Sequence, residues 1–158
     1  MRKTAIILII SLLIVFVGGY FAFAKFTGVK KPTKPSEYQL GISMEAALKT
    51  PDRPILAMFY ADWCTYCMKF MPTMKRLSEQ YRDKYNFVMI DSEDKDNINL
   101  VKDYRIGGFP TLYIIDPEID NRISIPISSY QSIDFMKEDL DRYLRVKKLM
   151  KCETKNEE

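Results

Sequence analysis

The feature that most restricts the fold is a continuous apolar run, Ile55–Tyr60, followed at once by two cysteines and a helical pattern. The run has strand length, and six consecutive apolar residues are typical of a strand buried on both faces in a mainly parallel sheet. From Cys67 to Tyr85, apolar residues recur every three or four positions, which predicts an amphipathic helix. Pro72 lies inside this helix and is expected to kink it.

The rest of the chain continues the alternation of helices and strands. Ser43 is a candidate N-cap of a short helix that carries Met44, Ala47 and Leu48 on one face. The further predicted elements are strand 87–90, helix 97–104, strand 111–115, strand 122–127 and an amphipathic helix from residue 133 onwards. The resulting order, α-β-α-β-α-β-β-α, predicts a compact α/β sandwich.

An uncharged and mostly apolar segment, residues 4–24, precedes this domain. A helix of that length could cross the hydrocarbon core, and Arg2 and Lys3 in front of it suit an export signal. One interpretation is a single-pass signal anchor, which we favour because the apolar stretch is long for a cleaved signal. The other is a signal peptide cleaved after Ala24, at the end of an Ala-x-Ala site.

Residues 25–36 contain four lysines and two prolines, and they predict a solvated linker before a domain at residues 37–150. The segment 151–158 is polar and is expected to be a frayed tail. A short basic N-terminus usually directs export, so we expect the domain on the periplasmic side of a membrane, anchored through residues 4–24. If the leader is cleaved, the domain is secreted to the periplasm.

The candidate chemistry lies in Trp63-Cys64-Thr65-Tyr66-Cys67, where the buried strand ends and the helix begins. A thiolate at a helix N-terminus is stabilised by free N–H groups and by the helix dipole. The spacing allows the two sulfurs to form a disulfide or a dithiol. A zinc site is disfavoured because Cys152 is the one further cysteine and the chain has no histidine. A purely structural disulfide remains the alternative.

Composition narrows the function further. Without histidine the chain has no Ser-His-Asp or Cys-His catalysis and no haem on a proximal histidine. The net charge of +3 does not indicate nucleic-acid binding. A second motif, Gly107-Gly108-Phe109-Pro110-Thr111, opens a predicted strand with a proline, which indicates either a cis peptide or an ordinary turn.

Together these motifs resemble the thioredoxin superfamily over roughly residues 40–146. The segment Tyr60-Ala61-Asp62-Trp63-Cys64 is most similar to C-terminal domains of transmembrane thiol:disulfide interchange proteins. The resemblance implies a thioredoxin-like α/β fold with a central mixed β-sheet flanked by helices. It also implies Cys64 as nucleophile, Cys67 as resolving thiol and Pro110 as a cis proline, with no cofactor and no metal beyond the redox-active disulfide.

The remaining site residues follow from the same resemblance. The backbone around Phe109 would pair with an extended substrate segment, as in strand addition. Trp63 would shield the cysteine pair, and Thr65 and Tyr66 would occupy the dipeptide between the cysteines. The expected partners are protein thiols and disulfides and a membrane electron donor.

Two departures from the family pattern concern proton transfer and redox potential. Thioredoxins have a buried Asp six residues before the first cysteine, where this chain has Met58, and strand 87–90 lacks the accompanying lysine. Cys67 must then lose its proton to water or another group, and Asp62 is a weak candidate that we expect to be simply solvated. The dipeptide Thr65-Tyr66 lacks the histidine of strongly oxidising relatives, so we expect an intermediate or reducing potential.

We therefore expect a thiol–disulfide oxidoreductase that acts on proteins, as a reductase rather than an oxidant. One alternative is a membrane-tethered binding or chaperone module with little redox turnover, and another is a reductase dedicated to one client. Cys152 is expected to be a free exposed thiol, with an intermolecular disulfide as the alternative. The charged run 91–96 is expected to be a solvated loop.

Overall fold

The computed structural model describes residues 9–17, 19–20 and 31–156, and the chain divides into an N-terminal unit, residues 1–31, and a domain, residues 32–158. In the N-terminal unit, residues 9–17 and 19–20 are helical. Among the described residues, no helix combines the length and the apolar character needed to cross a membrane. Part of the predicted anchor 4–24, and the cleavage point after Ala24, lie outside the described residues.

The domain is built on a four-stranded mixed sheet with the order β2-β1-β3-β4. The strands are β1 (Ile55–Tyr60), β2 (Asn86–Asp91), β3 (Thr111–Asp116) and β4 (Asn121–Ser124). β1 and β2 are parallel, whereas β1 with β3 and β3 with β4 are antiparallel. The mixed sheet is thus confirmed. The expectation of a mainly parallel sheet is wrong, because only the helical crossover between β1 and β2 gives a parallel pair.

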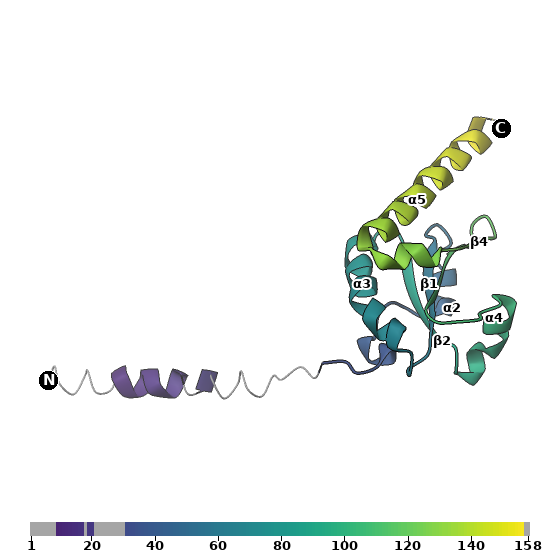
Figure 1. The fold of residues 1–158 in the computed structure, drawn as a ribbon. Coiled ribbons are helices and arrows are strands. Elements are labelled where there is room, and N and C mark those ends of the chain that lie inside the picture. The colour runs from purple at the N-terminus through teal and green to yellow at the C-terminus, as the bar shows by residue number, and fades with distance from the viewer. Residues whose placement is uncertain (1–8, 18, 21–30, 157–158) are drawn as a thin grey trace. The chain divides into compact units, whose positions relative to one another are not determined.

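Helices cover both faces of the sheet. The α-helices of the domain are α2 (Met44–Leu48), α3 (Thr65–Tyr81), α4 (Ile98–Asp103) and α5 (Ile133–Asn156), and the 3₁₀ turns are η1 (Pro35–Tyr38), η2 (Lys95–Asn97) and η3 (Ile127–Gln131). α3 and α5 pack on one face, and α2 and α4 lie on the other (Figure 1). Ser43 caps α2 as predicted, since its side chain accepts a hydrogen bond from the Ala46 N–H.

β1 is the centre of both cores because its side chains alternate between the two faces. Leu56, Met58 and Tyr60 pack with α3 and α5, whereas Ile55, Ala57 and Phe59 pack with α2 and α4. All six residues are buried, so the predicted two-sided burial is confirmed. Each large apolar side chain buried in this way stabilises the fold by about 1.5–3 kcal/mol.

Most element boundaries agree with the sequence prediction to within one residue, but three differ by more. α3 ends at Tyr81 and not at Tyr85, although Tyr85 is buried and its hydroxyl donates to the Leu140 carbonyl over 2.8 Å. β4 ends at Ser124 because Pro126 cannot donate to a ladder, and Ile127 begins η3. A frayed tail was expected after residue 150, but α5 continues to Asn156.

Candidate active site

The two cysteines lie where β1 passes into α3. Cys64 is the N-cap of α3, and its Sγ accepts a hydrogen bond of 3.0 Å from the Cys67 N–H. The two residues form a disulfide, with their Cα atoms 5.2 Å apart. An extended cap residue leaves the first N–H groups of the helix directed at its side chain. The same groups would stabilise a Cys64 thiolate after reduction.

The two sulfurs differ in access. Cys64 is 4% exposed and lines an opening of about 360 Å³, together with Trp63, Thr65 and Tyr66. Cys67 is 0% exposed and does not line this opening. An incoming molecule therefore meets Cys64 first, and Cys67 can be reached only by way of Cys64.

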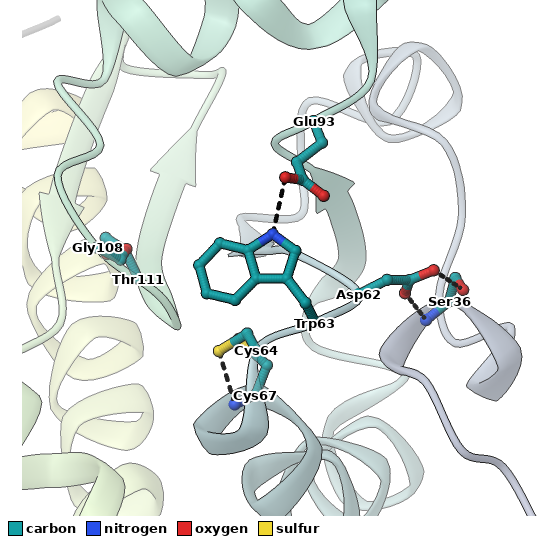
Figure 2. Close-up of a disulfide and its surroundings, with 8 residues drawn as sticks. All are labelled: Ser36, Asp62, Trp63, Cys64, Cys67, Glu93, Gly108 and Thr111. Carbon is teal, nitrogen blue, oxygen red and sulfur yellow. Dashed lines mark hydrogen bonds between the residues drawn. A yellow bond between two sulfur atoms is a disulfide. The ribbon is translucent and has the colours of Figure 1, made fainter.

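Trp63 lines the opening beside Cys64 and contacts the segment that follows β2. The residue is 68% exposed, yet its Nε1–H donates to Glu93 Oε1 over 2.7 Å, and its ring makes an edge-to-face contact with Phe109, with ring centroids 5.9 Å apart. Figure 2 shows the indole between Glu93 and Cys64. Glu93 is a site residue that the sequence interpretation missed, because the run 91–96 was expected to be only solvated.

A topological signal could have found Glu93. Parallel strands place their carboxyl ends at the same edge of the sheet, and β1 and β2 are parallel. The residues that follow Tyr60 and those that follow Asp91 must then meet at one edge. Ser92 N indeed donates to the Tyr60 carbonyl over 2.8 Å, directly beside Glu93.

The loop before β3 closes the other side of the site. The Phe109–Pro110 peptide is cis, which resolves the two interpretations of Pro110. Thr111 pairs with Phe59 of β1 and its hydroxyl donates to the Gly108 carbonyl over 2.7 Å. This register places the loop 107–110 at the end of β1 where the cysteines follow. Gly107, Gly108 and Phe109 line the same opening as Cys64.

Among the described residues, no aspartate or glutamate is buried beside the cysteines. Met58 is fully buried at the position of the family's aspartate. Tyr60 is nearby in the same core cluster as the cysteines, but its burial and the negative charge of Asp91 raise its pKa to about 12. Near neutral pH this hydroxyl keeps its proton and does not act as a base.

Asp62 has a different task from the one expected. Its two carboxylate oxygens accept hydrogen bonds from the Ser36 backbone N–H at 3.1 Å and from the Ser36 hydroxyl at 2.8 Å (Figure 2). Pro35 beside it is buried. The expectation of a simply solvated Asp62 is therefore wrong, and the end of the expected linker 25–36 belongs to the domain as part of η1. The contact ties the beginning of the domain to the loop that carries Cys64.

The fully buried acid of this domain lies elsewhere. Asp116 ends β3, where it contacts Lys147 Nζ at 2.7 Å and accepts a hydrogen bond of 2.7 Å from the Tyr143 hydroxyl. Since Thr111 stands at the cysteine end of β3, Asp116 stands at the opposite end. In the part of the chain that is described, no three cysteine or acidic side chains are grouped as metal ligands would be.

Cys152 is exposed on the last turns of α5 and forms no disulfide within the described part of the chain. It lines a shallow hollow with Leu144, Lys147, Lys148 and Lys151. This hollow is formed by α5 alone and contains none of the site residues above.

The family model described as Thioredoxin matches residues 40–142. Thiol:disulfide interchange protein TxlA of Synechococcus elongatus is 39% identical over 59 residues, which are 37% of this chain and 31% of the relative. The chloroplastic thioredoxin-like protein HCF164 of Arabidopsis thaliana is 28% identical over 117 residues, which are 74% of this chain and 42% of the relative. The chain thus spans less than half the length of these relatives.

Solved structures agree at the level of the fold. The germline-specific thioredoxin Deadhead of Drosophila melanogaster superposes with a TM-score of 0.52 at 23% identity, over 61% of this chain and 90% of that one. A thioredoxin from Halobacterium salinarum gives a TM-score of 0.52 at 24% identity, over 66% of this chain and 87% of that one. With the family match over most of the domain, this chain belongs to the thioredoxin family.

Proposed function

We propose that this protein is a thiol–disulfide oxidoreductase that reduces disulfides of other proteins. The observation that carries the proposal is the placement of Cys64. Its sulfur caps α3, accepts the Cys67 N–H and lines the opening, while Cys67 is buried behind it. This is the arrangement that a nucleophile with an internal resolving thiol requires.

The reaction has two exchange steps. In the reduced protein, the Cys64 thiolate attacks one sulfur of a substrate disulfide, forms a mixed disulfide and releases the other substrate sulfur as a thiolate. Cys67 then loses its proton to water and attacks Cys64 Sγ, which releases the second substrate thiolate and leaves the Cys64–Cys67 disulfide. The substrate gains two electrons, and its thiolates take up protons from solvent. A dithiol donor must return two electrons to the pair before the next cycle.

The neighbouring residues would position the substrate. The backbone of Phe109, which precedes the cis Pro110, borders the opening beside Cys64, where an extended substrate segment can pair by strand addition. Trp63 shields the mixed disulfide from water on one side, while Thr65 and Tyr66 form the rim on the other.

Direction and location complete the proposal. The dipeptide Thr65-Tyr66 offers no imidazolium to stabilise a thiolate, which favours a reducing over a strongly oxidising pair. We place the domain on the periplasmic side of a membrane, held by residues 4–24 and re-reduced by a membrane electron donor. Two similar proteins are named thiol:disulfide interchange proteins, which supports an exchange function.

Reduction of insulin disulfides, driven by a small dithiol, tests the proposed activity. The wild-type domain should precipitate insulin much faster than the dithiol alone. Cys64→Ser should return the rate to that background, because no nucleophile remains at the opening. Cys152→Ser is the matched control and should retain the wild-type rate, since Cys152 lies on α5 outside the site. A Cys64→Ser protein with wild-type turnover would refute the proposal.

Met58 favours a second candidate, a tethered binding or chaperone module of the same fold. Without the buried acid, proton release from Cys67 is slower and turnover could be too low to matter. The two candidates differ in a double variant, Cys64→Ser with Cys67→Ser. Two results together would identify the binding module as the correct function. The double variant would suppress aggregation of an unfolded client as well as the wild-type protein does, and the wild-type protein would reduce insulin only at the background rate.

A further inference from the structure

A larger groove continues from the cysteine opening towards η3. It measures about 770 Å³ and shares Tyr66 and the loop 107–109 with the opening over Cys64. Its other walls come from α3, from the start of β3 and from η3. The two hollows thus border one another, so a substrate polypeptide bound at Cys64 can continue into the groove. The groove extends well beyond the cysteine pair, which makes it a candidate for substrate selection.

Ring packing and hydrogen bonds hold the floor of the groove in place. Phe70 is buried there and packs against Tyr130 with ring centroids 5.4 Å apart. The Tyr130 hydroxyl accepts from the Leu112 N–H at 2.8 Å and donates to the Ile125 carbonyl at 3.2 Å. Burial raises the pKa of Tyr130 to about 12, so the hydroxyl keeps both bonds at neutral pH. A preformed floor reduces the entropy lost when a ligand binds.

The lining of the groove includes exposed apolar side chains and a single charged residue, beside the polar Thr73 and Gln131. Tyr66 is 72% exposed on α3, and Ile127 is 78% exposed at the start of η3. Lys69 is the one charged residue among the described lining residues, and its Nζ lies 5.6 Å from the centroid of the Tyr66 ring. Within the described residues, no carboxylate lies within ion-pair distance of Lys69, although other lysines of α3 and α5 have such partners. The groove therefore combines exposed apolar surface with an unneutralised cation.

We propose that this groove binds the stretch of a substrate polypeptide next to its reactive cysteine, and that it selects acidic–apolar sequences. One apolar side chain of the substrate lies between Tyr66 and Ile127, and a carboxylate one or a few residues further pairs with Lys69. The inference rests on the proposed function and names its substrate class. Charge complementarity supports this selection. Lys69 attracts a carboxylate of the substrate, whereas it repels a basic side chain that lies on the same apolar surface.

Disulfide-linked peptides test the selection. Each peptide contains one cysteine joined to a small thiol, an adjacent leucine, and Glu, Gln or Lys at one of the following positions. For the reduced wild-type domain, kcat/KM should fall in the order Glu, Gln, Lys, by about two- to fivefold per step at low salt, as exposed charge pairs do. Lys69→Glu should reverse this order.

Matched variants separate the groove from general charge effects. Lys75→Glu changes the net charge equally, also on α3, but Lys75 does not line the groove and pairs with Glu79. It should keep the wild-type order of peptides. Ile127→Ser should lower kcat/KM for the leucine peptide several-fold and leave an alanine peptide unchanged. Ile119→Ser, at an exposed isoleucine outside the groove, should change neither.

Each outcome decides a different point. An order of peptides that Lys69→Glu leaves unchanged would overturn the groove's role while the proposed activity stands. Failure of the wild-type domain to reduce any peptide would overturn the proposed function and the inference together. If light scattering showed a wild-type dimer that Ile127→Glu converts to a monomer, the groove would be covered by a second copy, and the inference would be wrong.

Discussion

The two ends of β3 differ in whether charged side chains are buried beside them. At Thr111 the strand begins beside two sulfurs that have no buried acid near them, in the described part of the core. About 17 Å away, at the other end of the strand, Asp116 is buried with Lys147 and Tyr143. The cysteine pair thus lies where no charged side chain is buried among the described residues, and the buried charges Asp116 and Lys147 lie at the opposite end of the strand.

This difference separates activation from stability. At the cysteine end, the groups available to stabilise a thiolate are backbone N–H groups at the start of α3, which do not titrate. At the Asp116 end, a buried ion pair fixes α5 to the sheet, and removal of one partner would leave the other charge buried without compensation. We therefore expect substitutions at one end to change rates and substitutions at the other to change stability.

Moving an acid to the cysteine end should break the separation most strongly. Met58→Asp places a carboxyl group without a charged partner in the core, so it should lower the free energy of unfolding by about 4 kcal/mol, as pKa shifts of isolated buried carboxyls imply. In folded protein, the mixed disulfide should resolve faster, because Cys67 gains a proton acceptor. Met58→Leu is the size-matched control and should change neither quantity much. Urea denaturation and stopped-flow resolution rates check both effects. If the mixed disulfide resolves at equal rates in Met58→Asp and Met58→Leu, water suffices as the proton acceptor for Cys67.

Removing the acid from the other end is the converse test. Asp116→Ala should lower the free energy of unfolding by about 3 kcal/mol, because Lys147 stays buried without its nearest partner. This loss of stability is at the low end of the range for removing one partner of a buried ion pair, since Lys147 also contacts Glu118 at 3.0 Å. Insulin reduction by the folded variant should be unchanged. A double variant, Asp116→Leu with Lys147→Met, should recover much of the stability. A large drop in turnover would contradict the separation of the two ends.

High pH should act on the tyrosines in and against the core cluster that contains both cysteines. Burial raises the pKa of Tyr60, Tyr81 and Tyr130 to about 12, above the usual value of 10.0. These tyrosines ionise first in the unfolded chain, so the stability they contribute is fully present below about pH 10 and is lost between about pH 10 and pH 12. Urea midpoints at about pH 8 and about pH 11 should show this fall. A midpoint that rises over this interval would contradict the assigned direction.

The smallest expected effect concerns the contact between Trp63 and Glu93. Glu93→Ala should lower the free energy of unfolding by about 1 kcal/mol or less, because the bond is exposed to solvent. The fluorescence of Trp63 should nevertheless change clearly, since it is the protein's single tryptophan and the indole loses its hydrogen-bond acceptor. Glu93→Gln keeps an acceptor oxygen and should resemble wild type. An unchanged spectrum in Glu93→Ala would show that Trp63 is held by Phe109 alone.

Local sequence patterns were enough to predict much of this domain. The apolar run of β1, the repeat of α3 and the spacing of Cys64 and Cys67 each depend on neighbouring residues, and the structure agrees with them. The cis proline needed the resemblance to a family, because five residues alone allowed two interpretations.

The features that were missed depend on residues far apart in the chain. Glu93 meets Trp63 across 30 positions, and Ser36 meets Asp62 across 26. Neither contact leaves a periodic signal, because each needs only one polar side chain at a suitable edge. The end of α5 was underestimated for a related reason, since its polar sequence hides the ion pair of 2.7 Å between Lys151 and Glu118.

The most direct test of the account is capture of the first intermediate. Cys67→Ala removes the resolving thiol, so a reduced Cys67→Ala domain mixed with a disulfide peptide should accumulate a mixed disulfide. Peptide mapping by mass spectrometry should locate the link at Cys64 and not at Cys152. A link found mainly at Cys152, or no trapped species while the wild-type domain turns over, would contradict the assignment of Cys64 as the nucleophile.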